Sequence, residues 1–131
     1  MKKLILDLDG TITLGDTSDY NKVSPNLDVI DKIKHYKSMG FEIVIQTARN
    51  MRTYEGNVGK INIHTLPTIT TWLDKHGVPY DEILVGKPWC GHDGFYVDDR
   101  AIRPSEFATK SFEEITELLA EETRENRKKC S

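Results

Sequence analysis

The stretch LILDLDGT, residues 4–11, constrains the fold of this chain more than any other. Its apolar residues predict a strand buried on both faces, as the central strands of parallel sheets are. Asp7 and Asp9 would face the same side of that strand, roughly 6–7 Å apart. Two carboxylates on one buried face repel each other and lose hydration unless a cation or a reaction requires them. A strand-ending Asp-Gly turn explains Asp9 and Gly10 but not Asp7. The pair therefore indicates a reactive or cation-binding site.

The whole chain is typical of one small globular domain. It has 131 residues and a formal net charge of −3, enough length to bury a core and too little basic charge for a general nucleic-acid binder. No apolar run reaches the length of a membrane span, and Asp7 interrupts the apolar start that could resemble a signal peptide. The two cysteines form no disulfide framework or paired metal motif. We expect a single cytoplasmic domain over 1–131, with no membrane partner and a frayed tail from about 123.

Strands alternate with helices along the chain, which predicts an α/β fold with a mostly parallel sheet. After the first strand, further strands are expected at 41–46, 81–86 and 94–99. The expected helices run from Ser24-Pro25 to Gly40, from about Pro67 to Gly77, and onward from a capping box at 111–114. The polar stretch 49–66 has no clear assignment.

Reactive side chains stand at the ends of all four expected strands. They are Asp7 and Asp9, then Thr47, then Lys87, and last Asp98 and Asp99. Ligands of open α/β sheets bind outside the carboxyl ends of the strands. Independent placement would scatter these residues over both ends of the sheet, whereas all of them fall at one end. The sequence therefore predicts one site that gathers four carboxylates, a hydroxyl and an ammonium.

Such a cluster of carboxylates favours phosphate chemistry with a divalent cation. A phosphate dianion would be repelled by about 4 kcal/mol per pair of unit charges 4 Å apart at an effective dielectric constant of about 20. One lysine does not offset this, but Mg²⁺, which prefers hard oxygen ligands, does. Asp7 would attack phosphorus, and Asp9 would protonate the leaving oxygen and later take a proton from water. Thr47, Lys87 and the backbone N–H groups after Asp7 would hold the equatorial oxygens.

The motifs DLDGT, QTAR, GKPW and YVDDR, in this order and spacing, resemble those of the haloacid dehalogenase (HAD) phosphatase superfamily. The resemblance covers the chain from Lys2 to about Phe107. It implies a three-layer α/β/α fold of the Rossmann type, with Asp7 as nucleophile and metal ligand. It also implies that Asp9 is the acid/base and binds the metal through its carbonyl, that Thr47 and Lys87 bind phosphate, and that Asp98-Asp99 completes the magnesium site. Which of the last two touches the metal stays open.

The run GKPWCGHDGFYVDDRAIRPSEF further resembles a small group of bacterial HAD proteins assigned to capsule polysaccharide biosynthesis. Most HAD enzymes carry a cap inserted after the first or third strand, and this chain has no room for one at either place. We therefore expect a Mg²⁺-dependent phosphomonoester hydrolase with an open site, acting on a small sugar or polyol phosphate. A receiver-like phospho-acceptor regulator and a nucleic-acid-end phosphatase are the alternatives. In receivers the paired acids come early in the chain, which disfavours the first alternative.

Residues around the expected site are candidates for binding the substrate. They are Gly10, Thr11, Arg49, Arg52, Lys60, Trp89 and Arg100. The arginines and the lysine are, taken one by one, ordinary solvated charges, and Trp89 is the better aromatic for stacking on a ligand because Trp72 has the spacing of a core residue. The stretch 49–66 follows Thr47 directly and has the length of a functional loop. We expect it to fold over the site as a miniature cap, alone or against a second subunit.

Overall fold

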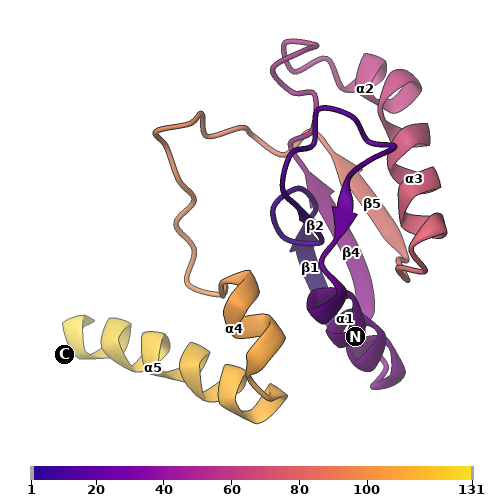
Figure 1. The fold of residues 1–131 in the computed structure, drawn as a ribbon. Coiled ribbons are helices and arrows are strands. Elements are labelled where there is room, and N and C mark those ends of the chain that lie inside the picture. Colours follow the sequence, from indigo (N-terminus) through magenta and orange to yellow (C-terminus); the bar gives the residue numbers. More distant parts are fainter. Residues whose placement is uncertain (1, 131) are drawn as a thin grey trace. The chain divides into compact units, whose positions relative to one another are not determined.

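The computed structural model describes residues 2–130 and contains two compact units, one extending to Trp89 and one beginning at Cys90. The first unit holds all five strands (Figure 1). Among the described residues, no helix is both long and apolar enough to cross a membrane. The expectation of a single domain over 1–131 stays a prediction.

The first unit is built on a parallel sheet in the order β1-β4-β5. Its strands are β1 (Lys3–Asp7), β4 (Glu42–Thr47) and β5 (Glu82–Val85), close to the predicted ranges. Asp7 pairs with Gln46, and Thr47 pairs with Val85. The three carboxyl ends therefore meet at one edge of the sheet, as the α/β prediction requires.

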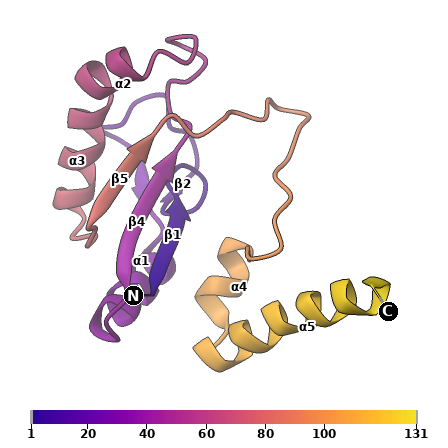
Figure 2. The same cartoon turned by 180° about the vertical axis from the view of Figure 1, so that it is seen from behind.

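Helices α1 (Leu27–Ser38) and α3 (Leu66–Lys75) lie on the same side of this sheet (Figures 1 and 2). Alternate strand residues face them and are buried, as period-two patterning requires. The core of this layer consists of Leu6, Ile43 and Ile45 from the strands with Ile30, Ile33, Ile69 and Leu73 from the helices. The first unit by itself thus has two layers, and the three-layer arrangement stays a prediction.

The opposite face of the sheet carries exposed apolar side chains. Ile5 of β1 is 58% exposed, and Leu84 of β5 is also exposed. The prediction that the first strand is buried on both faces is therefore wrong. Within the described residues β1 pairs with β4 alone and lies at an edge of the sheet, and an edge strand has less cover than a central one.

A short hairpin separates β1 from α1 and changes the predicted start of that helix. Strands β2 (Thr13–Leu14) and β3 (Ser24–Pro25) pair antiparallel. Ser24 and Pro25 are thus held in strand pairing rather than at a helix N-terminus, and α1 begins after Asn26. Gly40 follows the helix with a φ of 94°, a left-handed value that glycine tolerates. The predicted end of the helix is confirmed.

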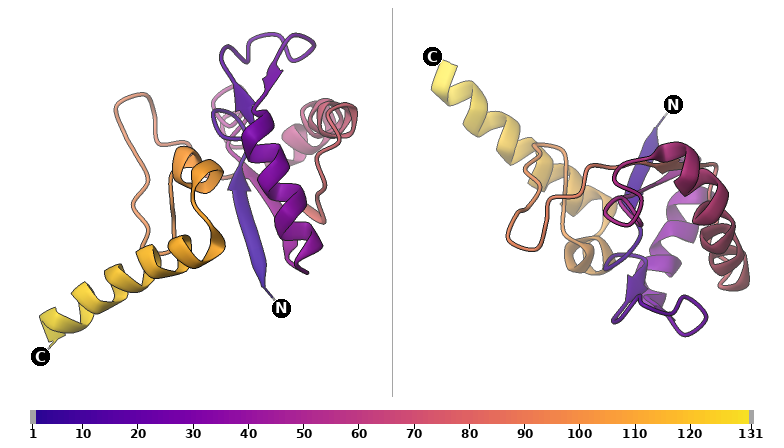
Figure 3. Two further views of the ribbon diagram at one scale, coloured as in Figure 1. Left: turned by 60° about the horizontal axis from the view of Figure 1, so that its bottom comes forward. Right: turned by 90° about the horizontal axis from the view of Figure 1, so that it is seen from above.

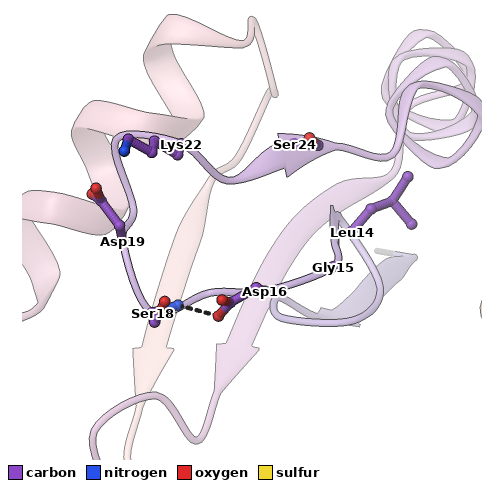
Figure 4. Close-up of a pocket in the computed structure, with 7 residues that line it drawn as sticks. All are labelled: Leu14, Gly15, Asp16, Ser18, Asp19, Lys22 and Ser24. Carbon is purple, nitrogen blue, oxygen red and sulfur yellow. Dashed lines mark hydrogen bonds between the residues drawn. The ribbon is translucent and has the colours of Figure 1, made fainter.

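The loop between β2 and β3 encloses a shallow pocket (Figure 4). Its lining residues are Leu14, Gly15, Asp16, Ser18, Asp19, Lys22 and Ser24. The Ser18 N–H donates to Asp16 Oδ1 at 2.8 Å and shapes the loop. None of the predicted site residues lines this pocket.

The stretch 49–66 is more regular than expected. A series of turns over 50–56 leads into α2 (Val58–His64), whose N-cap Asn57 accepts a hydrogen bond from the Lys60 N–H at 3.1 Å. Ile61 anchors this helix in the core. The polar stretch that had no clear assignment from the sequence thus contains a two-turn helix with an N-cap and one buried side chain.

The second unit is helical where it is regular. It contains α4 (Pro104–Thr109) and α5 (Phe112–Cys130), the latter one continuous helix in Figure 3. The predicted capping box is confirmed, because Ser111 Oγ accepts from the Glu114 N–H at 3.1 Å and Glu114 Oε1 accepts from the Ser111 N–H at 2.9 Å. Residues 123–130 continue α5 instead of forming a frayed tail, and Ser131 lies outside the described residues.

The predicted fourth strand, 94–99, is not formed. Among residues 2–130, this segment belongs to no helix and no strand. Phe95 and Val97 are 80% and 87% exposed, and Tyr96 is exposed as well. The apolar pattern of a strand is present, but a strand requires a neighbouring edge to pair with.

Candidate functional site

A tight turn after β1 presents the two carboxylates of the DLDGT motif. The Leu8 carbonyl accepts hydrogen bonds from the N–H groups of Thr11, Ile12 and Thr13, at 3.2, 2.8 and 3.1 Å. Gly10 has a φ of 81°, a left-handed conformation that a side chain would strain. The strand therefore ends at Asp7, and Asp9 stands in the turn rather than in the same strand as first expected.

Two polar side chains lie at long hydrogen-bond distances from the Asp7 carboxylate. The Lys87 ammonium lies 3.4 Å from Asp7 Oδ1, and the Thr11 hydroxyl donates to Oδ2 at 3.4 Å. Burial raises the pKa of the Asp7 carboxyl above its ordinary value, and the Lys87 ammonium offsets part of that rise. Both side-chain contacts are long, and a backbone hydrogen bond from Leu8 also lowers the pKa of Asp7.

Asp9 is held far more closely. The Tyr20 hydroxyl donates to its Oδ1 at 2.7 Å, and Nη1 of Arg49 donates to its Oδ2 at 3.2 Å. The Thr13 hydroxyl lies 3.4 Å from Oδ1. Both carboxylate oxygens of Asp9 therefore accept hydrogen bonds, and the orientation of the side chain is fixed.

Tyr20 and Arg49 also contact each other. The Arg49 guanidinium lies 3.9 Å from the centroid of the Tyr20 ring, and its Nη2 donates to the Thr17 carbonyl at 3.0 Å. Stacking of this kind suits the planar guanidinium. Burial, together with the Asp9 carboxylate, raises the pKa of Tyr20 far above its ordinary value. Tyr20 is therefore a permanent hydrogen-bond donor to Asp9 near neutral pH.

The Tyr20 ring connects the site to the hydrophobic core. It packs against Trp72 with the ring centroids 5.9 Å apart, and the Trp72 indole N–H donates to the Val23 carbonyl at 3.1 Å. Sequence reasoning placed Trp72 in the core and missed Tyr20. The only signal for Tyr20 was a single aromatic residue in an otherwise polar loop.

Thr47 joins the ends of β4 and β5. Its side chain is buried, and its Oγ1 accepts from the Arg49 N–H at 3.1 Å. Its carbonyl accepts from the Lys87 N–H at 3.1 Å. The structure thus brings Asp7, Asp9, Thr47 and Lys87 to one edge of the sheet, together with Thr11 and Arg49.

The other predicted substrate-binding residues of the first unit have mixed surroundings. The Gly10 N–H donates to Thr13 Oγ1 at 3.2 Å. Arg52 is exposed in the turns before α2, Lys60 is exposed on α2, and Trp89 is exposed after β5. The roles of these residues in substrate binding stay predictions, as does the covering of the site by 49–66.

Asp98, Asp99 and Arg100 belong to the second unit and are exposed. The Arg100 N–H donates to Asp98 Oδ1 at 2.7 Å, so the pair begins a turn. Within the described part of the chain, no group of three or more His, Cys, Asp and Glu side chains is arranged to hold a metal ion. Mg²⁺ binds through one or two carboxylates and keeps several waters, and its binding by this chain stays a prediction.

Comparison with known structures shows a strong similarity to another protein. A crystal structure of a protein from Vibrio cholerae is 74% identical in sequence, covers 93% of this chain and 99% of its own, and superposes with a TM-score of 0.91. This chain therefore belongs to the same protein family as the Vibrio cholerae protein. No family model and no curated protein matches the chain.

Two more distant structures are also similar to this chain. Both are described as structures of a Pnkp1/Rnl/Hen1 complex, the second as an RNA repair complex. They are 24% and 22% identical, cover 83% and 86% of this chain, and have TM-scores of 0.49 and 0.48. This chain spans only 34% and 31% of those chains.

Proposed function

We propose that this protein is a Mg²⁺-dependent phosphomonoester hydrolase that works through an aspartyl-phosphate. One observation carries the proposal. The Asp7 carboxylate lies beside the Lys87 ammonium at the carboxyl edge of a parallel sheet, and two residues further on Asp9 is held by Tyr20 and Arg49. The resemblance of the four motifs to HAD phosphatases supports the same reaction.

In the first step, an Asp7 oxygen would attack phosphorus while the bond from phosphorus to the leaving oxygen breaks. The leaving oxygen would take a proton from Asp9. In the second step, water would attack the phosphorus of the aspartyl-phosphate, Asp9 would accept its proton, and the phosphorus–oxygen bond to Asp7 would break. Inorganic phosphate is then released, Asp7 is again a carboxylate and Asp9 again carries its proton.

The surroundings of Asp9 supply a further detail of this reaction. Arg49 donates to Oδ2, so a proton on that oxygen would displace the guanidinium. Tyr20, which donates to Oδ1, would keep the carboxyl group oriented during the exchange. In this proposal Arg49 and Tyr20 act through Asp9 and are positioning residues.

Lys87 and Thr47 would bind the transferring phosphoryl group. Lys87 carries the positive charge nearest to Asp7, and Thr47 fixes the Lys87 backbone through its carbonyl.

Asp7 and the Asp9 carbonyl would hold Mg²⁺, with Asp98-Asp99 completing its ligands. When bound, Mg²⁺ would neutralise the charge that otherwise keeps a phosphate dianion away from the carboxylates. A small sugar or polyol phosphate, in capsule polysaccharide biosynthesis, is the substrate class that the resemblance favours.

A panel of phosphorylated metabolites tests the proposal. Release of inorganic phosphate is measured as kcat/KM with Mg²⁺ and again after EDTA treatment and dialysis. We expect activity that is lost with chelator and returns with Mg²⁺. Asp98→Asn and Asp99→Asn should raise the Mg²⁺ concentration required for half-maximal activity. Activity that survives exhaustive removal of metal contradicts the proposal.

A further inference from the structure

The outer edge of β1 is available for pairing. Among the described residues, β4 is the neighbour of β1 in the sheet, and the other side of β1 has no strand beside it. The residue after β5 is closely packed, because a Cβ on Gly86 would lie only 3.0 Å from Val58 Cγ2 of α2. Exposed sheet edges are templates for pairing with another chain. Ile5 adds an exposed apolar side chain to this strand.

Segment 94–99, GFYVDD, has the composition of a strand but belongs to none in the described chain. It presents three large apolar side chains in succession, Phe95, Tyr96 and Val97, all of them exposed. Aromatic and β-branched residues favour strands when they pack on a sheet, and soluble monomers seldom expose such continuous apolar surface. The segment therefore has the properties of a strand that lacks its sheet.

The connection from β5 to this segment is short. It consists of residues 86–93, fewer than the dozen or more that join two parallel strands of one sheet. A close turn shortens its reach further, because Gly94 packs against the Cys90 carbonyl so tightly that no Cβ would fit. Short hinge connections of this kind favour exchange of segments between copies.

We propose that segment 94–99 of each chain pairs, as a parallel strand, with the open edge of β1 in a second copy of the protein. A two-fold dimer would then exchange both segments and cover both edges. In the parallel direction, the end of the added strand carries Asp98 and Asp99 to the carboxyl edge, beside Asp7 and Asp9 of the other copy. This last consequence rests on the proposed function, since it would make each magnesium site a joint site of two chains.

The molar mass in solution tests the exchange without reference to activity. Sedimentation velocity on the full-length protein should give a dimer. Insertion of a flexible Gly/Ser segment of about twelve residues after Gly91 would supply the length that a crossover within one chain needs, and should convert the dimer into a monomer. The same insertion after Gly15, in the β2–β3 loop, is the matched control and should leave the dimer intact. A monomeric wild type, or a dimer that the Gly91 insertion leaves unchanged, would overturn the proposal.

Mixed dimers test the joint site. Two differently tagged chains, one Asp7→Asn and one carrying both Asp98→Asn and Asp99→Asn, are co-expressed and purified through both tags. Exchange predicts one intact site of two and therefore about half of the wild-type activity, at a Mg²⁺ concentration at which each variant alone is inactive. A site formed within one chain predicts no activity, which would overturn the joint site. If the wild type hydrolyses no phosphate ester, the proposed function fails, and the molar masses still decide the exchange.

Discussion

The two carboxylates of the DLDGT turn differ in how they are held, although they are only two residues apart. Asp7 has contacts of 3.4 Å to Lys87 and Thr11, whereas Asp9 accepts a 2.7 Å hydrogen bond from Tyr20 and an ion pair from Arg49. A nucleophile has to move toward phosphorus, while an acid/base has to stay aligned with the leaving oxygen. This difference supports the proposed roles, with Asp7 as the nucleophile and Asp9 as the acid/base.

Removing the Asp7 carboxylate should cause the largest loss of activity. Asp7→Asn leaves no group able to form the aspartyl-phosphate, so hydrolysis should fall to background in the phosphate-release assay. Asp16→Asn, which alters an exposed carboxylate in the β2–β3 loop, is the control and should retain activity. Residual activity of Asp7→Asn within tenfold of wild type would remove the nucleophile assignment.

Asp9→Asn should reduce kcat by roughly 10²–10⁴, the usual contribution of general acid–base catalysis. The loss should be smaller for p-nitrophenyl phosphate, because its leaving group needs little protonation. Rates are compared over a series of aryl and alkyl phosphates of increasing leaving-group pKa. An equal loss across the series would exclude Asp9 as the acid.

Arg49→Ala should lower kcat by about 10- to 100-fold, since a hydrogen bond to a charged group contributes about 1.5–3 kcal/mol. Because Arg49 contacts Asp9, the loss should follow the pattern expected for Asp9→Asn and be smaller for p-nitrophenyl phosphate. Tyr20→Phe should lower kcat in the same way but by a smaller factor. Arg52→Ala sharpens the test, since a role in substrate selection would raise KM for the natural substrate and leave p-nitrophenyl phosphate unaffected. An Arg49→Ala variant with that same selective KM effect would contradict the positioning role.

The smallest effects concern stability. The pKa of Asp7 is raised on folding, so its charged form destabilises the native state at neutral pH, and the effect disappears below its unfolded value of about 3.8. Asp7→Asn should therefore raise Tm at pH 7, by a few degrees at most, and change it little at pH 3.

Replacing Asp81 should change Tm at pH 7 in the opposite direction. The Ile43 N–H and the Lys37 ammonium lower the pKa of Asp81, so its contribution to stability is present at neutral pH and is lost on acidification. Asp81→Asn should lower Tm at pH 7 and have little effect at pH 3, by circular dichroism. If both variants changed Tm at pH 7 in the same direction, the directions of the two pKa shifts would be contradicted.

The sequence predicted the parts of this fold that depend on local signals. Gly40 and Gly77 follow their helices with positive φ values, and Asp7 and Thr47 end neighbouring parallel strands, as predicted. Asp98 and Asp99 do not end a strand, because 94–99 forms none in the described chain. The N-cap signal at Ser24-Pro25 failed because those residues pair with Thr13 and Leu14, a contact that no local pattern encodes.

The candidate site was predictable only in part, for the same reason. Asp7, Thr47 and Lys87 follow apolar runs, so their common edge can be inferred from the sequence. The contact of Tyr20 with Asp9 depends on how an irregular loop folds back, and no periodic pattern in the sequence predicts it. Segment 94–99 has the propensity of a strand, but propensity alone cannot supply the edge to which a strand pairs.

The packing of Tyr20 on Trp72 gives the protein an optical probe of its own site. Trp72 is buried and touches the ring that holds Asp9, whereas Trp89 is exposed, so their emission maxima should differ. The emission of Trp72 would report a displaced Tyr20 without any label. Ligand titrations could then be followed by intrinsic fluorescence, with Trp89→Phe removing the contribution of the exposed indole.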